Sequence, residues 1–245
     1  MRILWISRLT MGKTVGGVAD PVQIEVPHHL CLRGHDVHIV VPTFSKETDF
    51  YARRSFPIHF LPTIPVFTTF SFWLILWFYL PIMSKKFDVV VVDWLSFFGA
   101  LTMRRSSKAK IILDIRSPPV ETTHLRGLIS KIIFKPALFL AKYYSHGFTV
   151  ITHMLKDEIC RDFNVDKNLV GIWESGVDLS AFNQQSFNEE RLTLRKKLNI
   201  SERFVVMYHG VFSHTRGLQE TIKAFNFLKT SHPNIVFILL GQGEA

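Results

Sequence analysis

The residues best suited to chemistry in this sequence are two glycines and an arginine around one loop, Gly210, Arg216 and Gly217. The loop follows an apolar stretch, 204–209, that is typical of a buried strand, and it precedes an amphipathic stretch, 218–228, that is typical of a helix. Backbone N–H groups and the positive end of the helix dipole favour an anion at such a helix start. The guanidinium of Arg216 adds a fixed charge whose forked donors match a phosphate. The pattern therefore predicts a binding site for a phosphorylated ligand.

Two further glycines close this unit, because a second apolar strand ends on Gly241 and Gly243. A similar pair, Gly16 and Gly17, follows the apolar strand 3–7 near the start of the chain. Glycine has no Cβ, so the backbone at such turns can approach a bound ligand closely. A plain flexible turn is the alternative for Gly16 and Gly17.

A third candidate site lies where an apolar strand ends on Asp114 and is followed by Arg116. Ligands of open parallel sheets gather at the carboxyl ends of the strands, so Arg116 could bind an anionic group of a substrate. The alternative is structural, with Arg116 paired to Asp114 or Glu121 to hold the loop. His124 has the pKa range of a general acid or base, although it also fits the description of a surface residue. Arg116 and His124 are the two candidates for catalysis.

Apolar strands alternate with helical patterns from the start of the chain, and these elements position the candidate residues. The alternation predicts an α/β fold, with a mainly parallel sheet covered by helices on both faces. A polar, charge-rich stretch, 183–199, indicates a boundary between two domains near residue 180. The strands expected before that boundary are 3–7, 37–41, 89–93, 111–114 and 148–151.

Composition argues against several classes of protein. With 245 residues, 47% hydrophobic and 20% charged, the chain is globular and long enough for one large or two small domains. Cys31 and Cys160 lie far apart in sequence, so we expect no disulfide framework and no metal site. Free thiols fit a reducing compartment, and the chain opens on a short strand rather than a secretory segment, so we expect a cytoplasmic protein. The net charge is +9 without a nucleic-acid-binding motif, so no nucleic acid is expected as a partner.

One segment is unusually apolar, because residues 55–84 contain no Lys, Arg, Asp or Glu, and residues 67–83 are rich in aromatic side chains. Three interpretations fit it: a helix buried against the sheet, a helix lying in a membrane surface, and a membrane-spanning helix. Spanning would interrupt the alternation of strands and helices, so the first two are favoured. A later helical stretch carries Lys131, Lys135 and Lys142 on one stripe, which suits either an anionic membrane surface or an ordinary amphipathic helix.

The arginine loop resembles the second domain of the family-4 retaining glycosyltransferases, which have the two-domain GT-B fold. In that family a strand ends in Gly-Arg and Lys-Gly opens the next helix, so that the arginine and the lysine hold the diphosphate of a nucleotide-sugar donor. Here Gly210 and Gly217 match, Arg216 stands at the lysine position, and Val211 replaces the arginine. One of the two expected diphosphate cations is therefore absent or comes from elsewhere in the chain.

The resemblance implies two Rossmann-like domains of GT-B type. The first, residues 1–180, would bind the acceptor, and the second, residues 181–245, would bind the donor. The sequence stops before the pair of glutamates that the family uses, so we expect the second domain to be incomplete and the chain to be inactive alone. The resemblance assigns donor binding to Gly16, Gly17, Gly210, Arg216, Gly217, Gly241 and Gly243.

The implied reaction is transfer of a sugar, with retention, from a nucleoside diphosphate donor to a glycan or lipid-linked acceptor. The family works without a metal, so no cofactor is expected besides the nucleotide-sugar substrate. A peripheral position on the cytoplasmic face of an anionic membrane is a further expectation. Two alternatives stay open. One is a non-catalytic, membrane-associated binding subunit or degenerate transferase, which Val211 and the missing glutamates favour, and the other is a nucleotide-sugar epimerase of GT-B fold.

Overall fold

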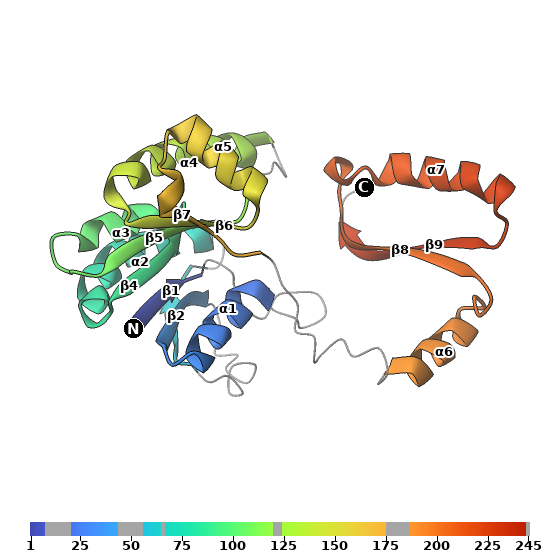
Figure 1. The fold of residues 1–245 in the computed structure, drawn as a ribbon, viewed down its shortest axis with the longest axis horizontal. Helices are drawn as coiled ribbons and strands as arrows, with labels where there is room; N and C mark the ends of the chain where they lie inside the picture. The colour runs from blue at the N-terminus through green and yellow to red at the C-terminus, as the bar shows by residue number, and fades with distance from the viewer. Residues whose placement is uncertain (8–20, 44–55, 65–66, 120–123, 175–186, 244–245) are drawn as a thin grey trace. The chain divides into compact units, whose positions relative to one another are not determined.

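The computed structural model describes residues 1–7, 21–43, 56–64, 67–119, 124–174 and 187–243. The chain divides into two compact units, Met1–Val177 and Asp178–Ala245. Each unit has a parallel sheet of its own, with seven strands in the first and two in the second (Figure 1).

The strands of the first unit are ordered β3-β2-β1-β4-β5-β6-β7, and every neighbouring pair is parallel. The order reverses between β1 and β4. In open α/β sheets, ligands bind outside the carboxyl ends of the strands at such a switch point. The bounds are β1 (Arg2–Ile6), β2 (Asp36–Thr43), β3 (Ile58–Pro62), β4 (Val89–Asp93), β5 (Lys110–Ile115), β6 (Gly147–Val150) and β7 (Val170–Ile172).

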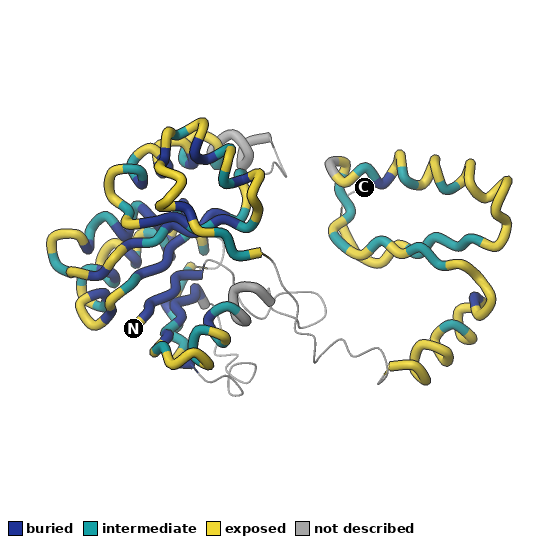
Figure 2. The backbone as a smooth tube through the Cα atoms, viewed as in Figure 1, coloured by how far each residue is buried: buried dark blue, intermediate teal, exposed yellow. Residues whose placement is uncertain are grey.

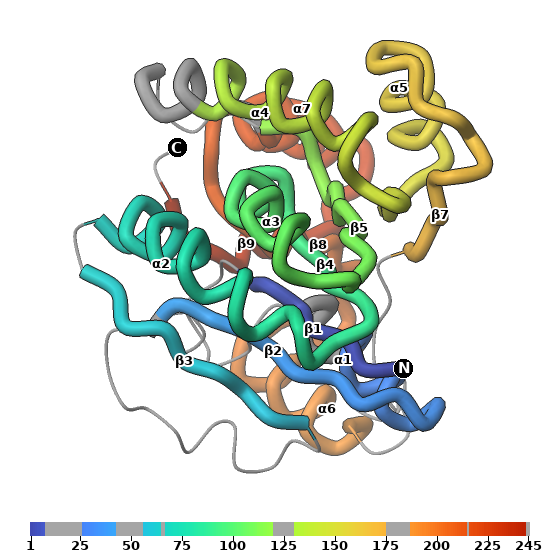
Figure 3. The backbone as a smooth tube through the Cα atoms, turned by 90° about the vertical axis from the view of Figure 1, so that its left-hand side faces the viewer, coloured from blue at the N-terminus to red at the C-terminus, as the bar shows by residue number. Residues whose placement is uncertain are grey.

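Helices cover both faces of this sheet. One face is covered by α1, which packs through Val26, Leu30 and Cys31. The other face is covered by α2 to α5, and Figure 3 shows α2, α3 and α4 in a row along it, where α3 contacts both neighbours. The bounds are α1 (Pro21–Leu32), α2 (Thr68–Met83), α3 (Phe97–Met103), α4 (His124–Tyr144) and α5 (His153–Phe163), with the single turns η2 (Ser84–Lys86) and η3 (Lys167–Leu169).

The strands are apolar on both faces, as expected for a parallel sheet between two helix layers. In β1, Leu4 and Ile6 enter the core beneath α2 to α5, whereas Ile3 and Trp5 enter the core beneath α1. This alternation follows from the pleat of a strand, which turns successive side chains to opposite faces. Figure 2 shows the buried residues, in dark blue, concentrated along the strands.

The uncharged apolar segment forms α2. Its inner face places Phe72, Leu76 and Leu80 in the core, with at most 2% of each residue exposed. The prediction of a helix packed on the sheet is therefore confirmed for this inner face. The outer face is exposed, and the most exposed of its large apolar residues is Phe78, of which 76% is accessible to solvent. Within the described ranges, no helix has the length and apolar content that a membrane crossing requires.

The second unit contains α6 (Asn188–Lys197) and the parallel pair β8 (Phe204–Phe212) and β9 (Ile235–Gly243). The chain passes from β8 through the single turn η5 (His214–Arg216) and α7 (Leu218–Ser231) into β9. The ring of Phe225 on α7 stacks on that of Phe237 on β9, with the centroids 4.3 Å apart. The strand–loop–helix–strand unit predicted around Arg216 is therefore present.

The predicted α/β fold and its parallel sheet are confirmed, and the five strands expected in the first domain are present with ends shifted by at most two residues. Two strands were missed. The sequence did not predict β3, and it assigned the stretch from residue 169 onward to the link between domains, although residues 170–172 form β7 of the first sheet. We predicted a boundary near residue 180, and the compact units divide after Val177.

Candidate functional site

The carboxyl edge of the first sheet holds a buried carboxylate, Asp114, near the end of β5, with 7% of the residue exposed. Its Oδ1 accepts hydrogen bonds from Thr149 Oγ1 at 2.8 Å and from Trp173 Nε1 at 3.1 Å. Its Oδ2 accepts a hydrogen bond from Arg116 Nε at 3.3 Å. The donors come from β6, from the residue after β7 and from the residue after β5, so the parallel sheet brings them to one edge.

Burial raises the pKa of Asp114 above its ordinary value of 3.8, because desolvation disfavours the charged form of the carboxyl group. The charge of Arg116 opposes this shift of the pKa, as do the hydrogen bonds from Thr149, Arg116 and Trp173. A buried carboxylate requires partners of this kind to stay ionised. The cluster therefore depends on the ion pair between Asp114 and Arg116.

Arg116 is held from two directions. Its Nε faces Asp114, and its guanidinium carbon lies 4.9 Å from the ring centroid of Trp173. Trp173 packs edge-on against Trp5, with 6.0 Å between the ring centroids. The structure thus contains the ion pair of the structural alternative, in which Arg116 holds the loop through Asp114. Because 22% of the Arg116 side chain is exposed, a positive group also remains at the edge of the sheet.

Thr149, Trp173 and Trp5 belong to this cluster and were not predicted. Thr149 is the register partner of Asp114 on β6, whereas Trp5 lies near the end of β1 and Trp173 follows β7. The available signal was a hydroxyl or indole group within one residue of the end of β1, β6 and β7. Bringing them together requires the strand order, which depends on pairings between residues far apart in the sequence.

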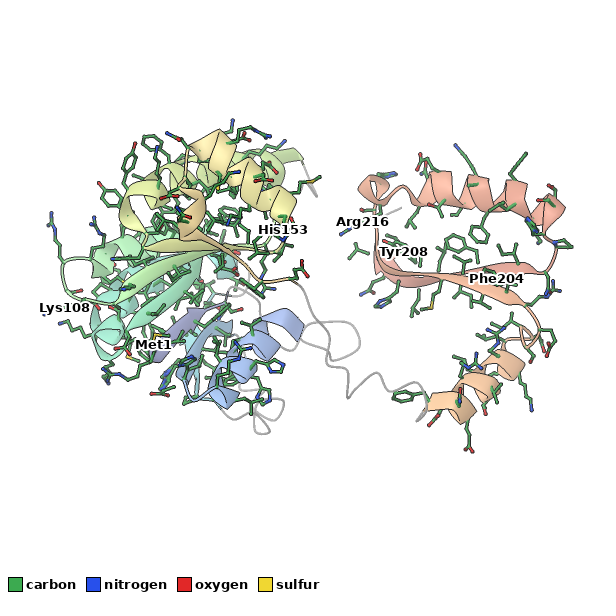
Figure 4. All side chains as sticks on the ribbon, viewed as in Figure 1. Met1, Lys108, His153, Phe204, Tyr208 and Arg216 are labelled. Carbon is green, nitrogen blue, oxygen red and sulfur yellow. The ribbon has the colours of Figure 1, made fainter. Side chains whose placement is uncertain are left out.

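Arg216 and Gly217 lie at the junction between β8 and α7. Gly217 has φ 63° and ψ 26°, a left-handed conformation that glycine adopts without strain, and it directly precedes the helix. The N-cap residue of α7 is Gly217, which has no side chain to cap the helix. The first N–H groups of α7 and the positive end of its dipole are directed at this loop. Arg216 is exposed, and Figure 4 labels it beside the start of α7, with Tyr208 nearby on β8 and Phe204 toward the other end of that strand.

Three predicted glycines lie where β8 and β9 approach each other closely. Gly210 is the register partner of Gly241, and a Cβ added at Gly241 would lie 1.8 Å from the carbonyl oxygen of Gly210. A Cβ added at Gly243 would lie 2.1 Å from the carbonyl oxygen of Phe212. Both distances are far inside van der Waals contact. A larger residue at Gly241 or Gly243 would therefore collide with the backbone of β8. Glycine also leaves these two positions near the end of β9 without side chains.

The remaining predicted residues are not placed. Gly16 and Gly17 lie outside the described residues, and so does Glu121. His124 is the first residue of α4, but its side chain is not among those described. Among the side chains that are described, no group of three or more His, Cys, Asp and Glu could hold a metal ion.

The two described clusters suit different tasks. In the first unit, a partly exposed cation is fixed on an indole ring beside a buried carboxylate, a geometry that can orient a polar ligand. In the second unit, an arginine and a glycine turn lie at a helix start, a geometry that favours an anion.

The Glycosyltransferase Family 4 model matches residues 24–181, which is well over half of the chain. The chain is 23% identical over 164 residues to an uncharacterized glycosyltransferase of Methanocaldococcus jannaschii, a match that covers 65% of this chain and 41% of that protein. The chain spans less than half the length of the curated relatives that it matches.

Solved structures with the same fold include two proteins crystallised with nucleotides. Anabaena HepE in complex with UDP-glucose has a TM-score of 0.71 at 14% identity, covering 99% of this chain and 61% of HepE. A Staphylococcus aureus TarM mutant in complex with fondaparinux, α-GlcNAc-glycerol and UDP has a TM-score of 0.65 at 8% identity, covering 99% of this chain and 72% of TarM. The UDP-N-acetylglucosamine 2-epimerase of Rickettsia bellii has a TM-score of 0.54 at 14% identity, covering 98% of this chain and 62% of the epimerase. The predicted GT-B-like α/β fold is confirmed.

Proposed function

Because this chain belongs to Glycosyltransferase Family 4, we propose that it transfers a sugar from a nucleoside diphosphate donor to a glycan or lipid-linked acceptor, with retention of the anomeric configuration. The family match over residues 24–181 is the observation that carries this proposal. The curated relatives are longer than this chain, so the activity is proposed for the whole protein.

The start of α7 supports a site for the donor diphosphate. An exposed arginine, Arg216, stands beside the N-terminus of α7, which begins after Gly217, and both the arginine and the helix N-terminus favour phosphate. HepE with UDP-glucose and TarM with UDP show that uridine nucleotides bind to proteins of this fold. Val211, at the position where the family has arginine, is an exposed apolar residue, so we assign the phosphate contact to Arg216.

The glycines complete the proposed donor site. A side chain at Gly241 or Gly243 would collide with backbone of β8, so the donor would meet bare backbone at the end of β9. We assign Gly210 and Gly217 to the same donor site. We also assign Gly16 and Gly17 to donor binding, as the family pattern implies. Positive charge from Arg216 and the α7 dipole can take the part that a metal ion plays at other diphosphate sites, so we propose no metal cofactor.

In the proposed reaction, the bond between the anomeric carbon and the β-phosphate oxygen breaks while a bond to the acceptor oxygen forms. The acceptor hydroxyl proton passes to a base or to the departing phosphate. Negative charge grows on the phosphate oxygen as the bond lengthens, so a fixed arginine and a preorganised helix start stabilise the transition state more than the ground state.

We assign the cluster around Asp114 to recognition of the acceptor or of the donor sugar. Its support is the partly exposed Arg116, which is fixed on Trp173 and paired with Asp114. His124 keeps its place as a candidate acid or base on the basis of its residue type. The free thiols of Cys31 and Cys160 suit a reducing compartment, so we propose that the reaction occurs in the cytoplasm.

A nucleotide-sugar epimerase is the second candidate, because the R. bellii epimerase has the same fold. The family match and the higher TM-scores of HepE and TarM favour sugar transfer. A non-catalytic binding subunit is the third, because Val211 removes one of the cations that the family uses.

One experiment separates these candidates. The protein is incubated with UDP-, GDP-, ADP- and dTDP-sugars and with glycan and lipid-linked acceptors, and the products are followed by nuclear magnetic resonance. We expect a nucleoside diphosphate to be released in proportion to a glycoside that keeps the anomeric configuration of the donor. A glycoside of inverted configuration would refute retention. An epimerised nucleotide sugar would identify an epimerase, and donor binding without any turnover would identify a binding subunit.

A further inference from the structure

The outer faces of α2, α3 and α4 form an exposed surface that is both apolar and basic. We call it the α2–α4 surface and define it by the exposed side chains on and beside these three helices. It comprises Phe67, Phe70, Leu74, Trp77, Phe78 and Ile82 at and along α2, Arg104 and Arg105 at the end of α3, and Ile132, Phe139 and Tyr143 on α4.

The apolar part of the surface is a continuous stripe on α2. Phe70, Leu74, Phe78 and Ile82 follow one another at intervals of four, and their exposed fractions are 57%, 40%, 76% and 67%. Residues at this spacing lie on one face of a helix. Ordinary surface helices place polar residues on that face, whereas α2 contains no charged residue at all. An exposed apolar patch of this kind marks an interaction site.

The neighbouring helices extend this stripe rather than interrupt it. The helices α2, α3 and α4 pack on the same face of the sheet, and α3 lies between α2 and α4 and contacts both (Figure 3). A groove of about 520 Å³ runs between them, and its lining includes Trp77, Leu101, Arg105 and Tyr144. Beside it, the guanidinium carbon of Arg104 lies 4.4 Å from the ring centroid of Tyr144. The groove therefore combines aromatic walls with two arginines.

The charge of the surface has one sign. None of the helices α2, α3 and α4 contains Asp or Glu. Exposed basic residues follow or interleave the apolar ones, namely Lys85 and Lys86 after α2, Arg104 and Arg105 after α3, and Lys131 and Lys135 on α4. Such a surface is complementary to an extended array of negative charge.

We propose that the α2–α4 surface docks on a lipid bilayer containing anionic phospholipid. The side chains of the α2 stripe enter the boundary between headgroups and acyl chains, and the basic residues bind lipid phosphates. Tryptophan and tyrosine favour this boundary because one part of each ring is apolar and the other is polar. An apolar helix face bordered by Lys and Arg is the pattern of interfacial membrane helices. The proposal goes beyond the transfer reaction, and its test uses no nucleotide.

The test is flotation of the 245-residue chain with two kinds of vesicle, one of phosphatidylcholine alone and one of phosphatidylcholine and phosphatidylglycerol in equal parts. We expect binding to the anionic vesicles that falls as salt is raised, and little binding to the neutral ones. Absence of binding to both vesicles by the folded protein overturns the proposal. So does equal binding to both, because it would leave the basic residues without a role.

Two substitutions locate the contact. Phe78→Ser removes an exposed ring from the stripe, and we expect the partition coefficient on anionic vesicles to fall by roughly tenfold. Phe227→Ser is the matched control, because Phe227 of α7 is 79% exposed and Phe78 is 76% exposed. Binding that survives Phe78→Ser but is lost in Phe227→Ser overturns the proposal.

The charged part is tested by replacing Arg104 and Arg105 together by alanine, with Lys196 and Lys197 of α6 replaced together as the control. We expect the arginine pair alone to weaken anionic binding, by roughly tenfold or more. Circular dichroism checks that each variant is folded. If light scattering shows instead a dimer that Phe78→Ser dissociates, and no vesicle is bound, a second copy covers the surface and the proposal is wrong.

Discussion

At the scale of residues, the balance around Asp114 decides how the first cluster behaves. The carboxyl group is buried, which raises its pKa, while Arg116, Thr149 and Trp173 stabilise its charged form. The net direction is upward, so desolvation outweighs its partners. The fold thus places Asp114 where desolvation disfavours its charge, and the ion pair with Asp114 fixes the position of Arg116.

This balance predicts a pH dependence of stability. A carboxyl group whose pKa is raised on folding contributes stability that is complete below its ordinary pKa and is lost as the pH rises through the folded value. The free energy of unfolding of the wild type should therefore fall, relative to Asp114→Asn, as the pH rises from about 4. Urea unfolding of both proteins at a series of pH values measures this difference, in which other titrating groups cancel. A free energy of unfolding of the wild type that instead rises with pH, relative to Asp114→Asn, would contradict the prediction, because it would mean that folding stabilises the charged carboxylate.

Single residues were predictable where a local motif carries the chemistry. Arg216 and Gly217 stand in a strand–loop–helix pattern that is legible over a few residues, and the structure contains that pattern. Thr149 and Trp173, which contact Asp114, and Trp5, which contacts Trp173, were not predictable. They meet only through the order of strands separated by long stretches of chain. The ion pair between Asp114 and Arg116 was foreseeable as one of two alternatives, since the residues are two apart.

At the scale of elements, the glycines of β9 show how closely two strands approach. Gly241→Ala would place a Cβ 1.8 Å from the carbonyl oxygen of Gly210. Backbone on both sides must then separate, and we expect a loss of at least about 1–3 kcal/mol in the stability of the β8–β9 pair.

Gly171→Ala on β7 is the matched control, because the nearest atom to its Cβ would be the carbonyl oxygen of Phe148 at an ordinary 3.8 Å. We expect stability to change there by no more than about 1 kcal/mol. Hydrogen exchange of the strand amides measures each effect locally. Protection of β8 and β9 that survives Gly241→Ala would show that the strands do not lie as described.

The helix α2 gives a second comparison within one element. Phe72 is 2% exposed and faces the core, so Phe72→Ala should destabilise the first unit by about 3–5 kcal/mol. Phe78 is 76% exposed, so Phe78→Ala should change the stability by no more than about 0.5 kcal/mol. Chemical unfolding of the two variants compares them directly. Equal losses would mean that the outer face is covered in solution.

The two strands that the sequence did not predict lie at the two edges of the first sheet. An edge strand pairs on one side only. The strand β7 is just three residues long, and β3, although it has five residues like β4, has just one residue that is fully buried. Neither shows the buried apolar run that marks a central strand such as Val89–Asp93, whose predicted and observed bounds coincide. Their existence depends on the neighbouring strand that they pair with, β2 for β3 and β6 for β7.

At the scale of the whole molecule, the family match and the proposed donor site fall mainly on different units. The match over residues 24–181 lies almost entirely in the first unit, Met1–Val177. The arginine, the glycine turn and the helix start lie in the second, Asp178–Ala245. The family match thus supports sugar transfer, and we propose that the nucleoside diphosphate donor of this reaction binds in the second unit.

Calorimetric titration of the chain with UDP, GDP, ADP and dTDP tests that claim most directly, using the wild type, Arg216→Ala and Lys229→Ala. Lys229 lies in the last turn of α7, at the opposite end of the helix from Arg216, and serves as the control. We predict that the wild type binds at least one of these nucleotides and that Arg216→Ala weakens binding by roughly tenfold or more, because a charge-assisted hydrogen bond is lost. Lys229→Ala should leave the affinity nearly unchanged. Equal affinities in wild type and Arg216→Ala, or no binding of any of the four nucleotides by the folded chain, would contradict a donor site at the start of α7.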